Sequence, residues 1–564
     1  MPLRPWLSHY DEAVPASLAP YPSHTLLHYI SETASQRPEH PAAIFRGARL
    51  TYSQLEQQSD AFAAALLSLG VKKGDRVALV LPNCPQFLIA EIGAWKVGAV
   101  LFPLNPLYSE QELQTALSNA GVETILVLSR FYNHLCSVRA ETPLKRIIVT
   151  NIKEYLPPTL RLLFTLFRER KEGHRVTLAA RDLWFQELLS THRNAGRPAS
   201  LPGPADPAVM LMSGGTTGTP KGVVGLHRSL VAAGLQLHAW MRPVSRDWSD
   251  VVMLPLPLFH VYASVGVQTY AIVGHNPLLL VPNPRDIGDL LSQIRKERPS
   301  FLSAVPTLFV AMLNHPDVAA GKADFRSVRI CFSGAAPLMA ETKRRFEELT
   351  GGRIVEGYSL TEAMMATFIN PVTGPNKIGS VGLPLPDVDV KIVDGEKGEA
   401  ELGARQVGEI IIRAPQLMEG YWRNPEETAI VLRARGSEGT WLHTGDLGYL
   451  DEDGYLFIVD RKKDLIKTSG YQVWPREVEE VLTSHPAVAE VGVAGVADVT
   501  KGEYVKAWVV LRPGMKATEE ELRAFCRKTV APYKVPRHIE FRSDLPKTMT
   551  GKVLRRALVA QERK

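Results

Sequence analysis

A glycine- and threonine-rich stretch at residues 212–223, MSGGTTGTPKGV, combines residue types that suit the binding of phosphate. Its glycines let backbone N–H groups approach an anion closely, its hydroxyls donate further hydrogen bonds, and Lys221 supplies a mobile positive charge. The stretch lies between the apolar runs 208–211 and 223–224, which is unusual for a flexible linker. It differs from the P-loop of nucleotide hydrolases, because Pro220 and Gly222 flank the lysine. The residues expected to contact phosphate are Ser213, Gly214, Gly215, Thr216, Thr217, Gly218 and Lys221.

Two further clusters place a histidine and small residues after apolar runs. In LPLPLFHVYA, His260 follows a predicted strand, although a lone histidine at such a place is more often a core or turn residue. In SGAAPL, the small residues Gly334, Ala335 and Ala336 would let a flat ring approach the backbone. Each cluster is a candidate wall of a binding site.

Two polar turns carry side chains that fit a nucleotide. In EGYSLTEA, which includes Gly357, an aromatic ring, a hydroxyl and a carboxylate follow one another at Tyr358, Thr361 and Glu362. Such a trio matches what a nucleotide with its Mg²⁺ needs. In WLHTGDLGYLD, Asp446 could accept hydrogen bonds from both hydroxyls of a ribose, although an aspartate in a turn usually satisfies its own backbone.

A last cluster, LPKTMTGKVLRR, places Lys552 in a glycine-containing loop ahead of basic residues. A lysine near the end of a chain is normally only solvated. The significance of Lys552 therefore depends on the other clusters.

The elements that would position these clusters alternate along the chain. Strands that are apolar throughout, such as ETILVLS, KRIIVTN and SFLSAVP, are separated by helical segments, which predicts parallel sheets covered on both faces. Gly47 is expected to turn a short hairpin. Short alternating strands follow after about Glu409, and a compact α+β run begins at Ser469. We expect a boundary in the charged stretch 460–464, which divides the chain into residues 1–460 and a small domain at 461–564.

Composition limits the class of protein. The chain of 564 residues is 45% hydrophobic and 22% charged, a globular profile that is large enough for two or more domains. Its four cysteines are scattered without a CxxC pair, which argues against a disulfide framework and a zinc site and indicates cytoplasmic thiols. The net charge of +6 does not by itself imply nucleic acid. The sequence lacks an apolar run near the ~20 residues that span a bilayer, and its start lacks the apolar core of a signal peptide.

The segment at 155–173, YLPPTLRLLFTLFRERKEG, interrupts the alternation. It places Leu160, Leu163, Phe164 and Phe167 on one helical stripe with basic residues elsewhere. Such a helix either packs its stripe on the domain or lies on an anionic membrane surface, and the sequence leaves both open. Peripheral contact with the inner membrane face is the hypothesis that we carry forward.

Taken together, the order and wording of these phrases resemble the adenylate-forming family, which includes acyl-CoA synthetases, luciferases and the adenylation domains of peptide synthetases. The resemblance covers nearly the whole chain. Within the family the sequence is most similar to bacterial long-chain fatty acid–CoA ligases, through SGGTTG, FHVY, EGYSLTEA and DRKKDLIKTSGYQVWPREVEEVL. It implies an α/β fold with a large N-terminal region of αβαβα layers, a distorted β-barrel subdomain and a small mobile α+β C-terminal domain.

The resemblance also implies roles in binding ATP and Mg²⁺. The glycine loop, with Thr216, Thr217 and Lys221, would hold the β- and γ-phosphates of ATP. Mg²⁺ would be held by Glu362 and Thr217. The remaining nucleotide contacts implied are the loop at 334–336, Gly357, Tyr358 against adenine, Thr361 at the α-phosphate, and Asp446 and Arg461 at the ribose.

Other implied roles concern catalysis and the movement between two half-reactions. The catalytic set implied is Lys552, Glu362, Thr217 and His260, with Lys552 reaching both the carboxylate and the α-phosphate. Lys463 falls at the hinge position, and Gly470 lies in the stretch that lines the pantetheine tunnel. Two departures from the usual pattern are Ser359, where many relatives have glycine, and Met212, where an aromatic residue is common.

The implied activity is the ATP-dependent conversion of a fatty acid to an acyl-adenylate with release of pyrophosphate, followed by transfer to CoA. Tyr262, Ala263, Ser264 and Val265 are candidate walls for an aliphatic chain, because this phrase holds no arginine or lysine to bind a second charge. The alternatives are a ligase for aryl or medium-chain acids, a fatty acyl-AMP ligase with another acceptor, and a catalytically silent acyl-nucleotide-binding protein. The expected partners are the fatty acid and CoA, with a homodimer as a further candidate and without nucleic acid.

Overall fold

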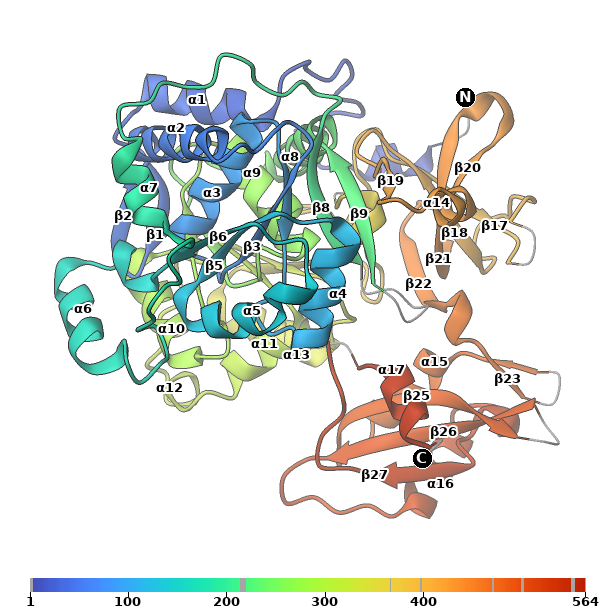
Figure 1. Cartoon of the computed structure of the whole chain (residues 1–564). Coiled ribbons are helices and arrows are strands. Elements are labelled where there is room, and N and C mark those ends of the chain that lie inside the picture. The colour runs from blue at the N-terminus through green and yellow to red at the C-terminus, as the bar shows by residue number, and fades with distance from the viewer. Residues whose placement is uncertain are drawn as a thin grey trace.

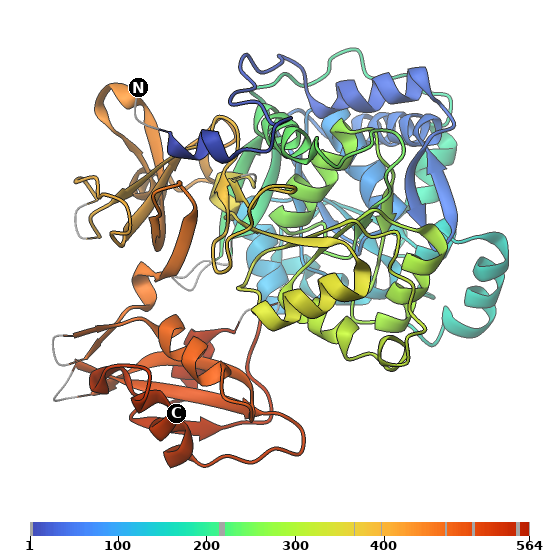
Figure 2. The same cartoon turned by 180° about the vertical axis from the view of Figure 1, so that it is seen from behind.

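The structure of this chain is a computed structural model that describes residues 4–213, 220–365, 367–395, 398–468, 471–498, 502–548 and 553–562. It consists of a large body and a smaller C-terminal body beside it, coloured red in Figure 1 and seen from behind in Figure 2. The expected α/β architecture, with a large N-terminal region and a small C-terminal domain, is confirmed.

The first large sheet has nine strands in the order β16-β15-β14-β13-β12-β10-β11-β1-β2. The strands from β14 to β1 run parallel to one another, as the apolar runs predicted, and antiparallel strands close both edges. Gly47, with φ of +88°, turns the expected hairpin between β1 and β2. The strands are β1 (Pro41–Phe45), β2 (Ala48–Thr51), β10 (Val252–Leu254), β11 (Leu278–Leu280), β12 (Phe301–Ala304), β13 (Ile330–Ser333), β14 (Arg353–Tyr358), β15 (Phe368–Ile369) and β16 (Leu383–Pro384).

The second large sheet has eight strands in the order β19-β9-β8-β4-β3-β5-β6-β7. It is parallel from β8 to β7, whereas β9 and β19 join its other end in antiparallel pairing. The glycine-rich stretch therefore connects two adjacent strands of one hairpin. The strands are β3 (Arg76–Val80), β4 (Val100–Pro103), β5 (Thr124–Leu128), β6 (Arg146–Thr150), β7 (Leu183–Trp184), β8 (Pro207–Ser213), β9 (Lys221–Leu226) and β19 (Gly420–Tyr421).

A buried layer joins the two sheets. Every residue of α3 (Pro85–Lys96) is buried, and Trp95 donates its indole N–H to the carbonyl of Ala208 on β8 at 2.9 Å. Just before this helix, the Asn83 amide donates to the carbonyls of Leu254 and Leu256 in the other sheet, at 2.9 and 2.7 Å. One continuous apolar core therefore spans both sheets.

The remaining helices of the large body pack around the sheets, except for α6, which protrudes, and two of them begin with a capping box. Thr51 caps α2 in a capping box with Gln54, and Ser109 caps α4 in the same way with Glu112. The helices are α1 (Leu26–Gln36), α2 (Tyr52–Ser68), α4 (Glu110–Ala120), α5 (Tyr132–Val138), α6 (Pro158–Leu163), α7 (Phe185–Thr191), α8 (His227–Met241), α9 (Gln268–Val273), α10 (Ile287–Glu297), α11 (Pro306–Leu313), α12 (Pro316–Ala319) and α13 (Ala340–Thr350).

A smaller antiparallel sheet follows in the chain. It lies in the region for which the resemblance implies a distorted β-barrel. It has the order β17-β18-β21-β20, and β22 pairs with β21. Its elements are β17 (Asp389–Val393), β18 (Gly408–Arg413), α14 (Pro425–Val431), β20 (Leu432–Ala434), β21 (Thr440–Leu450) and β22 (Leu456–Arg461).

The C-terminal body has a sheet and an apolar core of its own. Its core includes Val478, Leu482, Leu522 and Cys526, separate from the core of the large body. A domain of this size can bury such a core independently. Its elements are β23 (Ile466–Thr468), β24 (Tyr471–Val473), α15 (Pro475–Thr483), β25 (Val488–Asp498), β26 (Gly502–Leu511), α16 (Glu519–Arg527), β27 (His538–Phe541) and α17 (Arg555–Glu562).

Two histidines in the large body are buried in the neutral form. Burial lowers the pKa of His174 and of His227 to about 4. His174 contacts the Ser129 hydroxyl through Nδ1 at 2.9 Å, and His227 lies against the Trp95 ring at 5.7 Å between centroids. Neither ring nitrogen of His227 has a hydrogen-bond partner among the described residues.

We predict that acidification destabilises the fold through these histidines. Between pH 6.5 and 4 the unfolded chain binds their protons and the folded chain does not, so the free energy of unfolding falls as the pH falls. Each histidine should account for about 2 kcal/mol between pH 7 and pH 5. Urea unfolding at both pH values should show a smaller loss in His227→Phe than in the wild type. A matched change at the exposed His28, His28→Phe, should leave the loss unchanged.

Candidate functional site

The two ends of the glycine-rich stretch are held in register by the β8–β9 hairpin. Ser213 on β8 lies opposite Lys221 on β9, and Met212 lies opposite Gly222. A Cβ on Gly222 would come within 2.8 Å of the Met210 sulfur, so a glycine at this position lets β9 lie close to the Met210 side chain. The predicted phosphate contacts Gly214, Gly215, Thr216, Thr217 and Gly218 lie outside the described residues.

Lys221 extends from the start of β9 into a group of charged and aromatic side chains. Its ammonium lies 2.5 Å from a carboxylate oxygen of Glu427 and 5.0 Å from the centre of the Tyr421 ring. The Tyr421 hydroxyl in turn donates to Glu362 at 2.9 Å. Burial and the Glu362 carboxylate raise the pKa of Tyr421, so this hydroxyl keeps its proton. Lys221 and Glu362 therefore contact the same tyrosine side chain, Lys221 at its ring and Glu362 at its hydroxyl.

Glu362 and Thr361 lie on a single 3₁₀ turn (Thr361–Ala363) that begins shortly after β14 ends. The backbone N–H of Met418 donates to the Glu362 carbonyl at 3.0 Å, which fixes this turn to the segment before β19. Both predicted residues are half-buried. The turn thus holds a hydroxyl and a carboxylate next to the glycine hairpin.

The predicted adenine and ribose contacts meet one another directly. The Tyr358 hydroxyl donates to the Asp446 carboxylate at 2.6 Å, and the Arg461 guanidinium lies 3.4 Å from the other oxygen of that carboxylate. Burial and Asp446 raise the pKa of Tyr358 well above its usual value. Asp446 and Arg461 are also register partners of β21 and β22. A Cβ on Gly357 would come within 2.9 Å of the Phe368 carbonyl, which explains a glycine ahead of the tyrosine.

His260 and the SGAAPL loop come together through Tyr262. The backbone N–H of Tyr262 donates to His260 Nδ1 at 3.2 Å, and the Tyr262 ring would lie 3.1 Å from a Cβ on Gly334. Desolvation lowers the pKa of His260 to about 4, so the ring is neutral at neutral pH. Ala335 takes a left-handed backbone with φ of +69°, and Ala336 follows it half-buried. The candidate acyl-chain walls, which are Tyr262, Ala263, Ser264 and Val265, are all buried.

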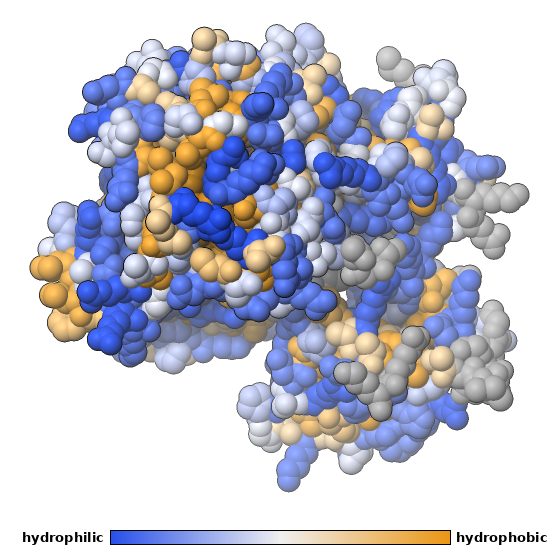
Figure 3. Space-filling model, in the orientation of Figure 1, coloured by the Kyte–Doolittle hydropathy of each residue, from blue (hydrophilic) through white to orange (hydrophobic). Residues whose placement is uncertain are grey.

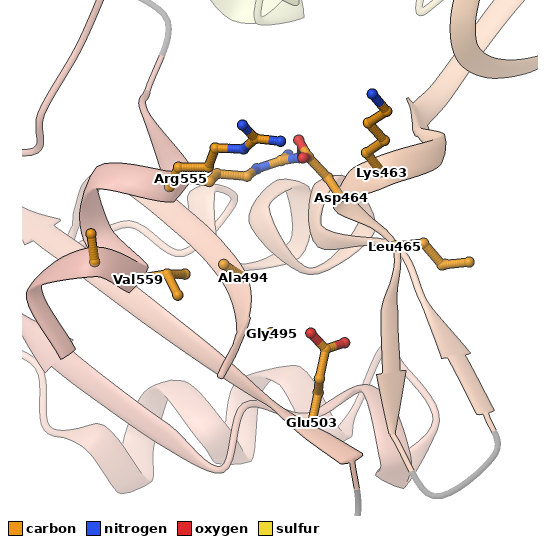
Figure 4. A pocket seen from close by; sticks show the side chains of 10 residues that line it. Lys463, Asp464, Leu465, Ala494, Gly495, Glu503, Arg555 and Val559 are labelled. Carbon is orange, nitrogen blue, oxygen red and sulfur yellow. Dashed lines mark hydrogen bonds and ion pairs between the residues drawn. The ribbon is translucent and has the colours of Figure 1, made fainter. Parts of the chain in front are cut away.

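The segment between β22 and β23 joins the large body to the C-terminal body. Lys463 lies there on a short 3₁₀ turn (Lys462–Asp464) with its side chain exposed. It borders a cavity of about 350 Å³ that is also lined by Asp464, Glu503 and Arg555 (Figure 4). The predicted residues Gly470 and Lys552 lie outside the described residues.

Arg555, at the start of α17, holds this junction together. Its guanidinium lies 2.8 Å from Asp460, 3.1 Å from Asp464 and 2.7 Å from Glu479. Figure 4 shows Arg555 and Asp464 pointing toward each other. Asp460 also accepts the backbone N–H of Arg476 at 2.8 Å. The last residues of the large body are thus paired with two helices of the C-terminal body.

Comparison with known proteins agrees with this arrangement. The sequence profile of a family described as AMP-binding enzyme matches residues 30–422, and the profile of the AMP-binding enzyme C-terminal domain matches residues 477–552. The chain belongs to the AMP-binding enzyme family. The resemblance to adenylate-forming enzymes is therefore confirmed.

Individual relatives of this AMP-binding enzyme match it over almost its whole length. A long-chain-fatty-acid–CoA ligase of Bacillus subtilis (strain 168) is 40% identical over 560 residues, which cover 99% of this chain and 98% of the relative. The ATP-bound structure of MatB from Rhodopseudomonas palustris is 26% identical with a TM-score of 0.81, covering 96% and 99% of the two chains. The anthranilate CoA ligase AuaEII in complex with anthranoyl-AMP is 26% identical with a TM-score of 0.83, covering 97% and 99%.

Two residues of this AMP-binding enzyme contact Lys221 or Glu362 although their own phrase carries no functional signal. Tyr421 and Glu427 belong to the phrase GYWRNPEET, whose aromatic and acidic residues look like an ordinary surface turn. Only the pairing of β19 with β9 places them beside Lys221. A glutamate near the start of a helix is also favoured by the helix dipole, so its type alone carried no functional signal.

The Arg555 cluster leads to a stability prediction. Arg555→Met would leave three poorly exposed carboxylates without their shared cation, so the C-terminal body should lose about 3 kcal/mol of stability. Thermal or urea unfolding followed by the fluorescence of Trp508 and Trp474 would measure it. The adjacent Arg556 has an exposed side chain, and Arg556→Met is the matched control. Equal stabilities of the two variants would contradict the role of Arg555.

Proposed function

We propose that this AMP-binding enzyme is a long-chain fatty acid–CoA ligase. Two groups of contacts support this most strongly. At one end of the site Tyr358 bonds to Asp446. At the other end Tyr421 contacts both Lys221 and Glu362. The first group suits an adenosine and the second suits phosphates, and only three residues separate Tyr358 from Glu362 in the chain. The similarity to bacterial ligases of this name supports the same conclusion.

In the first half-reaction, a carboxylate oxygen of the fatty acid forms a bond to the α-phosphorus of ATP. The bond from that phosphorus to the bridging oxygen breaks, and its electron pair leaves with pyrophosphate. The developing charge is negative, so the enzyme needs cations and N–H donors rather than a covalent nucleophile. Lys221 would hold the departing pyrophosphate, and Lys552 would contact the carboxylate and the α-phosphate.

Glu362 fits the magnesium ion that such a reaction requires. One of its oxygens accepts from Tyr421, and a carboxylate is the hard oxygen donor that Mg²⁺ prefers. Thr217 would be a second ligand. When bound, the ion neutralises charge on the phosphates. Asp446 and Arg461 would orient the ribose, and Tyr358 with the loop at 334–336 would position the adenine.

In the second half-reaction, the CoA sulfur bonds to the acyl carbon, the bond from that carbon to the phosphate oxygen breaks with its electron pair leaving on AMP, and the thiol proton passes to solvent. Two reactions at one acyl group need two surroundings. We infer a boundary after residue 460 and a rotation of the C-terminal domain about Lys463, which would replace Lys552 by the stretch around Gly470. The turn at Lys462–Asp464 holds no buried residue, which supports a hinge there, and the rotation would exchange the contacts of Asp460 with Arg555 and Arg476 for others.

An aliphatic acid is the substrate class that the candidate acyl-chain walls support. The buried residues from Tyr262 to Val265 are apolar or small, and none of them carries a cation for a second charged group. His260 is neutral and borders this phrase, so it would contact the substrate without fixing a charge. Burial of methylenes is favourable by about 0.8 kcal/mol each, which favours long chains over short ones.

The proposal predicts the substrate profile of the purified enzyme. A pyrophosphate-release assay over C2 to C20 acids should show a maximum among long chains, and CoA should convert the adenylate to a thioester. Lys552→Ala should slow adenylate formation by ~100-fold and spare thioester formation from preformed acyl-AMP. A maximum with aryl acids, or release of pyrophosphate without transfer to CoA, would replace the proposal with one of the alternative activities.

We further propose that the enzyme works at an anionic membrane surface through the element formed by α6 and the π-helical turn Phe164–Arg168. This element protrudes from the large body in Figure 1, and Figure 3 shows a hydrophobic patch at the same edge. Leu162, Leu166 and Phe167 are 60%, 66% and 70% exposed. Of the stripe expected from the sequence, Phe164 alone is half-buried, with its ring 5.3 Å from His174.

Basic side chains lie next to this apolar element. They would attract an anionic lipid surface and repel a positively charged protein. Arg168 is the last residue of the element, Arg170 and Lys171 follow it, and all three are exposed. Apolar side chains flanked by cations are typical of helices that lie in the headgroup region of anionic membranes. Within the described chain, no helix has both the length and the apolar character for a membrane crossing. Contact at the surface would suit a substrate that partitions into lipid.

The membrane proposal predicts co-sedimentation with vesicles that contain an anionic lipid. Leu166→Glu with Phe167→Glu should weaken binding roughly tenfold or more, because two apolar side chains lose their burial. Neutral vesicles should bind less than anionic ones. Leu107→Glu with Ile378→Glu changes two exposed apolar residues elsewhere and is the matched control. Unchanged binding of the first double variant would refute membrane contact by this element.

A further inference from the structure

The ammonium of Lys221 already has a carboxylate partner. Glu427 contacts it at 2.5 Å, with the lysine side chain 17% and the glutamate side chain 36% exposed. The hydrogen bond from Lys221 holds the pKa of Glu427 below its usual value, so the carboxylate is charged at neutral pH. Lys463 is a second cation that acts on Glu427. The lysine assigned to phosphate is thus one half of an ion pair.

The backbone holds Glu427 in place opposite this lysine. Asn424 caps α14 by accepting the backbone N–H of Glu427 at 3.1 Å. The next residue, Thr428, accepts the backbone N–H of Tyr421 at 2.9 Å and donates to the Asn424 carbonyl at 2.8 Å. Tyr421 belongs to β19, whose partner is β9. The helix that carries Glu427 is therefore tied to the strand that carries Lys221.

Two effects of Glu427 oppose the binding of phosphate at Lys221. The ammonium must leave the carboxylate before it can contact a phosphate fully, and the carboxylate charge repels any anion nearby. Both effects act equally on the β- and γ-phosphates of ATP and on free pyrophosphate. An interaction that changes the free energies of the ground state and the transition state by the same amount alters the affinity for the ligand. It leaves the rate of the chemical step unchanged.

We propose that Glu427 is a positioning residue that competes with phosphate for Lys221 and thereby keeps ATP and pyrophosphate loosely held. This inference rests on the proposed function, because it assigns Lys221 to the departing pyrophosphate. Its benefit would be release of the product: without a competing anion, a lysine at this place would retain pyrophosphate and favour the reverse reaction. Glu427 would return to Lys221 as the pyrophosphate leaves.

Glu427→Gln tests the proposal, because it removes the charge and keeps the shape. The KM for ATP and the inhibition constant of pyrophosphate should both fall about two- to fivefold, the range of a partly exposed ion pair, with kcat nearly unchanged. Calorimetric titration with pyrophosphate should show the same gain in affinity. Glu427→Asp retains the charge on a shorter side chain and should lie between the wild type and the glutamine variant. Glu426, next to it on α14, is exposed, and Glu426→Gln is the matched control.

The outcomes separate this inference from the proposed function. If the wild type neither binds pyrophosphate nor releases it from ATP with a fatty acid, the proposed function is wrong. If the wild type does both and Glu427→Gln binds pyrophosphate no more tightly, competition by Glu427 is wrong. A higher KM and a lower kcat in Glu427→Gln would also overturn it, since they would make Glu427 a ligand of the substrate or of its metal. A structural role alone would lower the melting temperature without tightening pyrophosphate binding.

Discussion

The antiparallel pairing of β9 and β19 at the end of an otherwise parallel sheet is the constraint on which the site depends. Parallel strands need long crossover connections, whereas an antiparallel hairpin returns within a few residues. The hairpin therefore places Ser213 and Lys221 opposite each other at one edge. The addition of β19 then brings Tyr421 and α14 to the same edge, although about two hundred residues separate them from the hairpin in the chain.

Charge pairing is the second organising feature, and it acts differently at two places. At the glycine hairpin the pair of Lys221 and Glu427 is partly exposed, so separating the two charges costs little free energy. At the domain junction Arg555 is shared by three carboxylates and is only 16% exposed. Removal of one partner from such a cluster is costly, so it stabilises one arrangement. The chain thus combines a weak ion pair at the glycine hairpin with a strong charge cluster at the junction.

Much of the architecture follows from local patterns. The apolar runs around β5, β6 and β12 form buried parallel strands, because a strand that is covered on both faces needs apolar residues throughout. Gly47 turns the expected hairpin, because its positive φ is unfavourable for other residue types. The amphipathic segment at 155–173 was different. Its periodicity could not decide between a packed and an exposed stripe, since that depends on whether another element covers it. The structure leaves Phe167 exposed and packs Phe164 on His174.

The sequence by itself determined the family of the chain, because the order of its glycine-rich loop, tyrosine–glutamate turn and Thr-Gly-Asp turn resembles that of adenylate-forming enzymes, and the family profiles confirm it. Tyr358, Glu362 and Asp446 were singled out in this way, and the structure shows Tyr358 bonded to Asp446 and Glu362 bonded to Tyr421. Only the tertiary structure decided which side chains partner them. Glu427 and Arg555 are ordinary charged residues in their own phrases, and their roles arise from contacts with residues far away in the chain. Coulomb attraction depends on the distance between charges, and desolvation depends on burial. Neither the distance nor the burial can be predicted from the neighbouring residues in the sequence.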